Sequence, residues 1–145
     1  MKITVLDAGT LGNDVDLSVI TDLGDAELFE KTAEDETAER IKDSEVVILN
    51  KVKLNENNLR NADKLKLICI TATGFDNVDV EYCRKKGIAV CNVCGYSTDS
   101  VAQLTVLTAL ALVMHLEEYD GFVKSGEYTK SGMHNRLSPA FHEVS

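Results

Sequence analysis

Short apolar segments alternate with helix-forming segments five times in the first two thirds of this 145-residue chain. The apolar segments span residues 2–7, 26–29, 45–50, 66–71 and 88–92. Continuous apolar strands that alternate with helices are typical of a parallel sheet with helices over both faces. Because the crossover connections are right-handed, we expect an α/β, flavodoxin-like, doubly wound parallel five-stranded sheet with strand order 2-1-3-4-5.

The connecting segments have helix-forming patterns and span residues 16–23, 32–43, 55–61 and 78–86. On the first of them, three apolar side chains are expected to face inward: Leu17, Ile20 and Leu23. Thr32, with Asp35 three residues on, predicts the N-terminal cap of the second. Gly87 suits the left-handed position that ends the last.

A long and mostly apolar helix is predicted for residues 100–116, followed by an arm with short helical pieces over residues 121–145. We therefore divide the chain into a flavodoxin-like domain, residues 1–98, and a linking helix and arm, residues 99–145. One side of the helix is apolar through Val101, Leu104, Leu107, Leu110, Ala111 and Met114. An apolar face of that size marks an association site.

Composition excludes several functions. The net charge of -9 and the pI near 4.7 argue against nucleic acid and anionic membranes as partners. The sequence has no apolar run long enough to span a membrane, and residues 1–7 read as a strand rather than a signal peptide. A cytoplasmic protein is the expectation.

The cysteines predict no metal centre. Cys69 and Cys91 lie in apolar strand-like segments and are expected to behave as small buried hydrophobes. The Cys91-x-x-Cys94 pair has redox or metal spacing, but none of the three histidines completes a ligand set. We therefore expect a structural role for the pair.

The loops after the first, third and fourth strands are predicted to meet, because ligands bind outside the carboxyl ends of parallel strands. These loops are residues 7–12, 50–53 and 71–76. Gly74 would let main-chain N–H groups approach a small anion, and Lys51 and Lys53 add positive charge. The alternative is that Gly74 only shapes a turn and that both lysines are solvated.

Two other loop functions are weaker. Residues 7–12, with Glu30 after the second strand, imitate a dinucleotide fingerprint but lack its first glycine. A phospho-receiver domain would share the strand order, but the position at the end of the third strand is Asn50 and not an aspartate.

Two motifs resemble the NAD-dependent D-2-hydroxyacid dehydrogenases: TATGFDNVD at 71–79 and NVCGYSTDSVAQ at 92–103. The glycerate dehydrogenase or hydroxypyruvate reductase subgroup is the most similar in appearance. The resemblance implies that Lys51, Val52, Thr73 and Gly74 bind the carboxylate of a small 2-hydroxy or 2-oxo acid, largely through backbone N–H groups. It also implies that Val101 and Thr105 lie near the nicotinamide of the cofactor. Gln103 departs from the family, which often has glutamate there.

The family's glycine-rich NAD loop and its catalytic histidine, acidic partner and arginine would lie beyond Ser145. The resemblance therefore implies the substrate-domain part of an oxidoreductase that transfers a hydride between NADH and a 2-oxo acid such as hydroxypyruvate or glyoxylate. We expect the isolated chain to contain no catalytic residue, to be inactive and to bind NAD weakly at most.

An alternative is a non-catalytic module that binds a small carboxylate or mediates dimerisation. It would keep the carboxylate loops and use the predicted helix 100–116 for assembly. Under either interpretation we expect a homodimer that forms through this helix.

Overall fold

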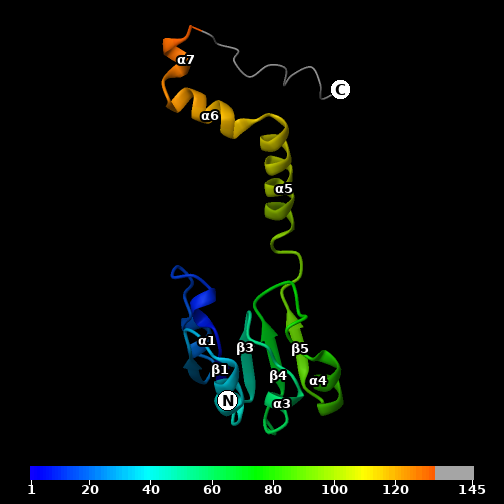
Figure 1. Cartoon of the computed structure of the whole chain (residues 1–145). Helices are drawn as coiled ribbons and strands as arrows, with labels where there is room; N and C mark the ends of the chain where they lie inside the picture. The colour runs from blue at the N-terminus through cyan, green and yellow to red at the C-terminus, as the bar shows by residue number, and fades with distance from the viewer. Residues whose placement is uncertain (133–145) are drawn as a thin grey trace. The chain divides into compact units, whose positions relative to one another are not determined.

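The structure is a computed structural model that describes residues 1–132 and divides into two compact units, Met1–Tyr96 and a second that begins at Ser97 (Figure 1). The strands of the first unit are β1 (Lys2–Val5), β2 (Asp25–Leu28), β3 (Val46–Leu49), β4 (Leu67–Ile70) and β5 (Ala89–Asn92). Its helices are the 3-10 turn η1 (Ala8–Thr10) and α1 (Ser18–Thr21), α2 (Glu34–Ile41), α3 (Glu56–Leu59) and α4 (Val80–Lys86).

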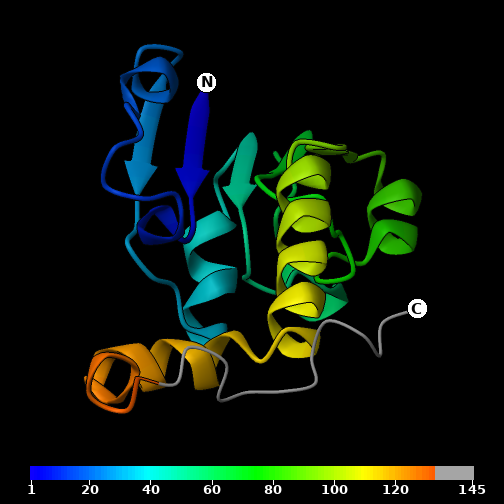
Figure 2. The ribbon, with the colours of Figure 1, turned by 90° about the horizontal axis from the view of Figure 1, so that it is seen from above.

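The five strands form one parallel sheet in the order β2-β1-β3-β4-β5, which confirms the predicted fold class. Figure 2 shows β2, β1 and β3 as neighbouring arrows that point the same way. All carboxyl ends of the strands therefore lie at one edge of the sheet, and the loops that follow them start there.

One face of the sheet is buried at its central strands. Val47 and Leu49 of β3 and Ile68 and Ile70 of β4 are at most 1% exposed. They share a core cluster with apolar side chains from three helices, which are Ile41 of α2, Leu59 of α3 and Cys83 of α4. The three helices lie on the same face because each rightward crossover in the sheet is right-handed.

The opposite face is only partly covered, in contrast to the prediction of helices over both faces. Ile48 and Cys69, which alternate with the buried residues, are half-buried, whereas Ala89 and Cys91 of β5 are exposed. Only the connection from β1 to β2, which contains α1, runs toward the β2 edge of the sheet, so its right-handed crossover puts α1 on this face. There α1 contacts β2 and leaves β4 and β5 uncovered. The prediction that Cys91 is buried is wrong for the same reason.

The start of α2 differs from the predicted capping box. The helix begins one residue later, with Ala33 as its N-terminal cap, and the Glu36 carboxylate accepts a hydrogen bond from the Ala33 N–H at 3.0 Å. Neither Thr32 nor Asp35 forms the predicted pair. Another misplacement concerns Leu23, which was expected to face inward and is 66% exposed.

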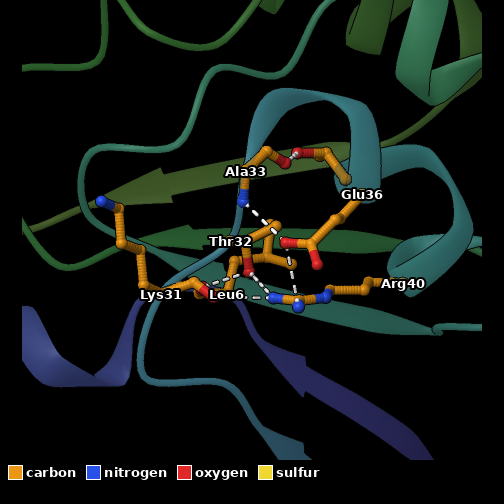
Figure 3. A network of polar contacts seen from close by, with 7 residues as sticks. Leu6, Lys31, Thr32, Ala33, Glu36 and Arg40 are labelled. Atoms are coloured by element: carbon orange, nitrogen blue, oxygen red, sulfur yellow. Dashed lines mark hydrogen bonds and ion pairs between the residues drawn. The ribbon is translucent and has the colours of Figure 1, made fainter.

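The Thr32 hydroxyl instead belongs to a polar network that joins α2 to the end of β1 (Figure 3). It donates a hydrogen bond to the Leu6 carbonyl and accepts one from the Arg40 guanidinium at 2.6 Å. Arg40 also pairs with the Glu36 carboxylate at 3.0 Å and lies 4.0 Å from the centre of the Phe29 ring. The network fixes the strand end from which the first site loop begins.

The second unit contains α5 (Thr98–Val113), α6 (Leu116–Lys124) and α7 (Glu127–Lys130). The predicted helix 100–116 is thus interrupted at His115, whose φ of 51° is left-handed. The segment from residue 121 is more helical than the predicted arm, because α6 continues through Gly121 and α7 follows. The rest of the predicted arm, residues 133–145, lies outside the described residues.

Candidate functional site

A buried carboxylate organises the loop after β3. Asp7, at the carboxyl end of β1, is 5% exposed. Its Oδ1 accepts a hydrogen bond from the N–H of Asn50 at 2.8 Å, and its Oδ2 accepts from the N–H groups of Lys51 at 2.6 Å and Val52 at 3.3 Å. Hydrogen bonds from several N–H groups offset the cost of burying a charge.

The carbonyl side of the same loop is held by Asn77. Its side-chain Nδ2 donates hydrogen bonds to the carbonyls of Asn50 at 3.1 Å and Val52 at 2.8 Å. The backbone carbonyl of Asn77 accepts from the N–H of Leu54 at 2.9 Å. The loop after β3 is therefore fixed on both sides, and Asn77 connects it to the loop after β4.

The loop after β4 has donors that are free. Its Thr73 hydroxyl donates to the Val93 carbonyl at 3.0 Å, and the Asn92 Nδ2 donates to the Thr73 carbonyl at 2.7 Å. The backbone N–H groups of Thr73 and Gly74 make no hydrogen bond within residues 1–132. Both residues are exposed and follow β4 at the carboxyl edge of the sheet.

Local strain does not explain why residue 74 is a glycine. Gly74 has no positive φ, and a Cβ placed on it would come closest to the Asp76 Oδ1, at 3.3 Å. The turn itself would therefore accept an alanine with a small shift of that carboxylate. Without a side chain at residue 74, the two free N–H groups remain accessible to a small anion, and the Asp76 carboxylate is the nearest neighbour of that position.

A cavity of about 270 Å³ lies at the same edge of the sheet. It is lined by Thr10, Leu11, Asn50, Thr71, Val93 and Tyr96. These residues follow β1, β3, β4 and β5. The loops after β1, β3 and β4 thus meet around a cavity, as predicted, and the loop after β5 also lines it. The Asn50 Nδ2 donates to the Thr10 Oγ1 at 3.0 Å, while its buried Oδ1 has no partner in the described residues.

The four residues predicted to bind substrate lie on two loops at this edge. Lys51, Thr73 and Gly74 are exposed, and Val52 is half-buried. The cavity is lined by their chain neighbours Asn50 and Thr71 rather than by the four residues themselves. The N–H groups of Lys51 and Val52 already bind Asp7, which leaves those of Thr73 and Gly74 as the available pair.

Asp7 and Asn77 are the residues that sequence reasoning missed. The available signal was an aspartate directly after a central buried strand, since a buried carboxylate needs donors from a neighbouring loop. The loop sequence at residues 7–12 drew attention to a nucleotide fingerprint instead. In the structure Gly9 packs closely against Glu30. A Cβ at residue 9 would lie only 2.9 Å from the Glu30 carbonyl oxygen. Close packing thus accounts for this glycine.

The predicted cofactor contacts lie in the second unit. Val101 and Thr105 are exposed on α5, and the Thr105 hydroxyl donates to the Val101 carbonyl of its own helix at 2.7 Å. No group of three histidine, cysteine or acidic side chains in residues 1–132 has the arrangement of a metal site.

Comparison with known proteins identifies the family. The family described as "D-isomer specific 2-hydroxyacid dehydrogenase, catalytic domain" matches residues 4–143. This chain belongs to that family.

Two curated relatives of the family are enzymes. A glyoxylate reductase of Thermococcus litoralis is 44% identical over 79 residues, which cover 54% of this chain and 24% of the relative. A hydroxypyruvate reductase of Blautia hydrogenotrophica is 30% identical over 132 residues, which cover 88% of this chain and 41% of the relative. The chain thus spans less than half the length of these relatives.

Solved structures of the family agree with the fold. A D-lactate dehydrogenase of Aquifex aeolicus, in complex with NAD and lactic acid, has a TM-score of 0.71 and 29% identity. The match covers 86% of this chain and 37% of that one. A 2-hydroxyacid dehydrogenase of Ketogulonicigenium vulgare has a TM-score of 0.76 at 21% identity, covering 96% of this chain and 42% of that one, which supports the fold alone.

No single helix within residues 1–132 is long and apolar enough to span a membrane. By length and composition alone, α5 and α6 together would reach it, but they are bent by 66° with respect to each other.

Proposed function

We propose that the first unit is the substrate-binding half of an NAD-dependent D-2-hydroxyacid dehydrogenase. The parent reaction is the reversible transfer of a hydride between NADH and a 2-oxo acid such as hydroxypyruvate or glyoxylate. The observation that carries the proposal is the pair of free N–H groups at Thr73 and Gly74, beside a cavity at the carboxyl edge of the sheet. The names of the curated relatives support the choice of substrates.

The substrate carboxylate is held by this N–H pair. N–H groups that donate to an anion form charge-assisted hydrogen bonds, and the exposed Lys51 adds positive charge from the neighbouring loop. Lys51 contributes through its side chain, because its N–H group binds Asp7, whereas Val52 supports the loop by packing against the core. The rest of a small 2-oxo acid would extend toward the cavity that Asn50 and Thr71 line.

The cofactor belongs to the parent enzyme. Bound NADH would supply the hydride, and Val101 and Thr105 would contact its nicotinamide end from α5. The isolated chain is proposed to bind the acid without turning it over and to bind NAD weakly at most. The cytoplasmic location and the absence of nucleic-acid and membrane partners also stay predictions.

Thermal unfolding with paired ligands tests the proposal. Hydroxypyruvate should raise the melting temperature of the chain, whereas hydroxyacetone, which has a methyl group in place of the carboxylate, should not. A ligand at a hundredfold excess over its Kd stabilises the folded state by about 2.7 kcal/mol. Equal shifts with both compounds, or none with either, would contradict carboxylate binding.

Gly74→Ala serves as the matched variant. It should keep the melting temperature of the free protein, because its Cβ has a single close neighbour, and lose most of the shift caused by hydroxypyruvate. The same samples should oxidise no NADH with hydroxypyruvate or glyoxylate. Clear turnover by the purified chain would refute the proposed inactivity.

A second candidate function is assembly. The exposed apolar side chains of α5 lie on all sides of the helix, beyond the single face that was predicted, since Val106, Leu112 and Val113 are also exposed. A helix that is apolar all round is normally buried. This observation favours a homodimer through α5, in the parent enzyme or as a non-catalytic module.

A further inference from the structure

Two cysteines face each other across neighbouring strands. Cys69 of β4 and Cys91 of β5 are partners in the parallel register, so their side chains point to the same face of the sheet. Neighbouring strands are about 4.8 Å apart, and a disulfide needs about 4.4–6.8 Å between its Cα atoms. The backbone spacing therefore permits a bond between the two sulfur atoms.

The surroundings leave this pair accessible. It lies on the partly covered face of the sheet, where Cys91 is exposed and Cys69 is half-buried. Both thiols are free. β5 is an edge strand that pairs with β4 alone, so it can shift slightly to bring the two side chains together.

We propose that Cys69 and Cys91 are a redox modification site that forms a reversible disulfide by exchange with a low-molecular-weight disulfide. The Cys91 thiolate attacks the reagent, forms a mixed disulfide and releases one small thiol. The Cys69 thiolate then attacks the Cys91 Sγ, closes the protein disulfide and releases the second small thiol. The two protein thiols lose two electrons and two protons, and the reagent gains them.

The order of attack follows from the environment of each thiol. Burial raises the pKa of the Cys69 thiol, and the nearby Cys91 thiol raises it further. Cys69 is thus the less reactive of the two toward a reagent in solution, while the exposed Cys91 is reached first. The closing step should accelerate as pH rises, because more Cys69 is then ionised.

The other two cysteines do not compete for this partner. Cys83 is fully buried in α4, within the core on the opposite face of the sheet. The Cys94 Sγ lies 3.6 Å from the Oδ1 of Asn92, whose side chain alternates with that of Cys91 and points to the other face. Cys94 is therefore directed away from Cys91 in spite of the Cys-x-x-Cys spacing.

The disulfide would crosslink β4 and β5, the two strands that lead to the candidate site. Thr71 and Val93 follow the two cysteines by two residues each, and both line the cavity. In reducing compartments, disulfides of this kind are transient and respond to the redox state. The inference does not depend on the proposed dehydrogenase function.

Peptide mapping after oxidation tests the site. The 145-residue chain is incubated with oxidised glutathione, digested without reduction and analysed by mass spectrometry. We expect a linked peptide that joins Cys69 to Cys91, a mass lower by two hydrogen atoms, and full reversal by dithiothreitol. A link between Cys91 and Cys94, or glutathione adducts that never resolve, would overturn the inference.

Two single variants separate the steps. Cys69→Ser should stop at a glutathione adduct on Cys91, whereas Cys91→Ser should leave Cys69 largely unmodified at neutral pH. Cys94→Ser is the matched control and should form the linked peptide as the wild type does. Loss of the linked peptide in Cys94→Ser would contradict the assignment.

Discussion

At the scale of single residues, Asp7 has the largest influence on the site. Its carboxylate occupies three N–H groups of the loop after β3, so this loop cannot offer them to a substrate. The anion site that we propose is therefore on the loop after β4, where the N–H groups of Thr73 and Gly74 are free. One buried side chain thus determines which of two adjacent loops has free N–H groups.

The variant Asp7→Asn should destabilise the fold. It replaces one accepting oxygen by an NH₂ group that faces an N–H donor, and it removes the charge that strengthens the remaining hydrogen bonds. We expect the free energy of unfolding to fall by about 2–3 kcal/mol in urea denaturation. Asp14→Asn, at an exposed aspartate of the same region, should change it by less than about 0.5 kcal/mol. Equal effects of the two variants would argue against the role of Asp7.

The location of the candidate site was predictable from the sequence, but the hydrogen bonds within it were not. Thr73 and Gly74 directly follow a buried strand, and the edge where such loops meet is fixed by strand order. The Asp7 contacts span more than forty positions in the chain. No local pattern shows which N–H groups a distant carboxylate will occupy.

Among the secondary-structure elements, Glu45 connects three strands just before β3. Its carboxylate accepts a hydrogen bond from the Lys2 N–H of β1 at 3.3 Å and pairs with the Lys66 ammonium beside β4 at 2.8 Å. The hydrogen bond from Lys66, followed by that from the Lys2 N–H, lowers the pKa of Glu45 below its ordinary value. This stabilisation is present above the ordinary pKa and is lost as pH falls through the lowered one.

Acid titration of the variant Glu45→Gln measures this contribution. The wild type should lose stability as pH falls through the ordinary pKa of glutamate and below it, and the variant should lose less, because it has no carboxylate to protonate at this position. The urea midpoint at each pH is the readout. Parallel curves for the two proteins would show that the Glu45 contacts do not stabilise the fold.

Two glycines without close neighbours have opposite predicted effects. Gly87 ends α4 at φ 73°, and Gly121 lies inside α6 with no positive φ. Gly87→Ala should cost about 1 kcal/mol of unfolding free energy, because the left-handed region disfavours a Cβ. Gly121→Ala should instead favour its helix by about 1 kcal/mol. Circular dichroism during urea and thermal unfolding checks both, and a destabilised Gly121→Ala would contradict the assigned backbone conformations.

The existence of each strand and α-helix of the first unit was predictable, while the 3-10 turn η1, the ends of the elements and the coverage of the sheet were not. The apolar strands and Gly87 gave strong local signals. Thr32 misled because its hydroxyl bonds to Leu6, a tertiary contact, instead of capping α2. Similarly, His115 adopts a left-handed φ within a sequence that continues to favour helix, so the break after α5 had no residue signature.

For the whole molecule, the exposed apolar surface of α5 predicts self-association. Leu104 and Leu107 are 63% and 59% exposed, and burying such side chains contributes about 1.5–3 kcal/mol each. The chain should be a dimer at high micromolar concentration by light scattering, and the double variant Leu104→Glu, Leu107→Glu should be a monomer. Val15→Glu, at an exposed apolar residue of the first unit, should remain a dimer. A monomeric wild type would contradict the α5 interface.

Residue-resolved NMR tests the central claim, that the loop after β4 of this family member binds the substrate carboxylate. Millimolar affinity corresponds to about 4 kcal/mol, so the chain labelled with nitrogen-15 is titrated with hydroxypyruvate to several times that range. The account predicts that the backbone amide signals of Thr73 and Gly74 move most, and that those of Asn50, Lys51 and Val52 move little. Largest shifts at Asn50–Val52, or no shift at Thr73 and Gly74, would contradict it.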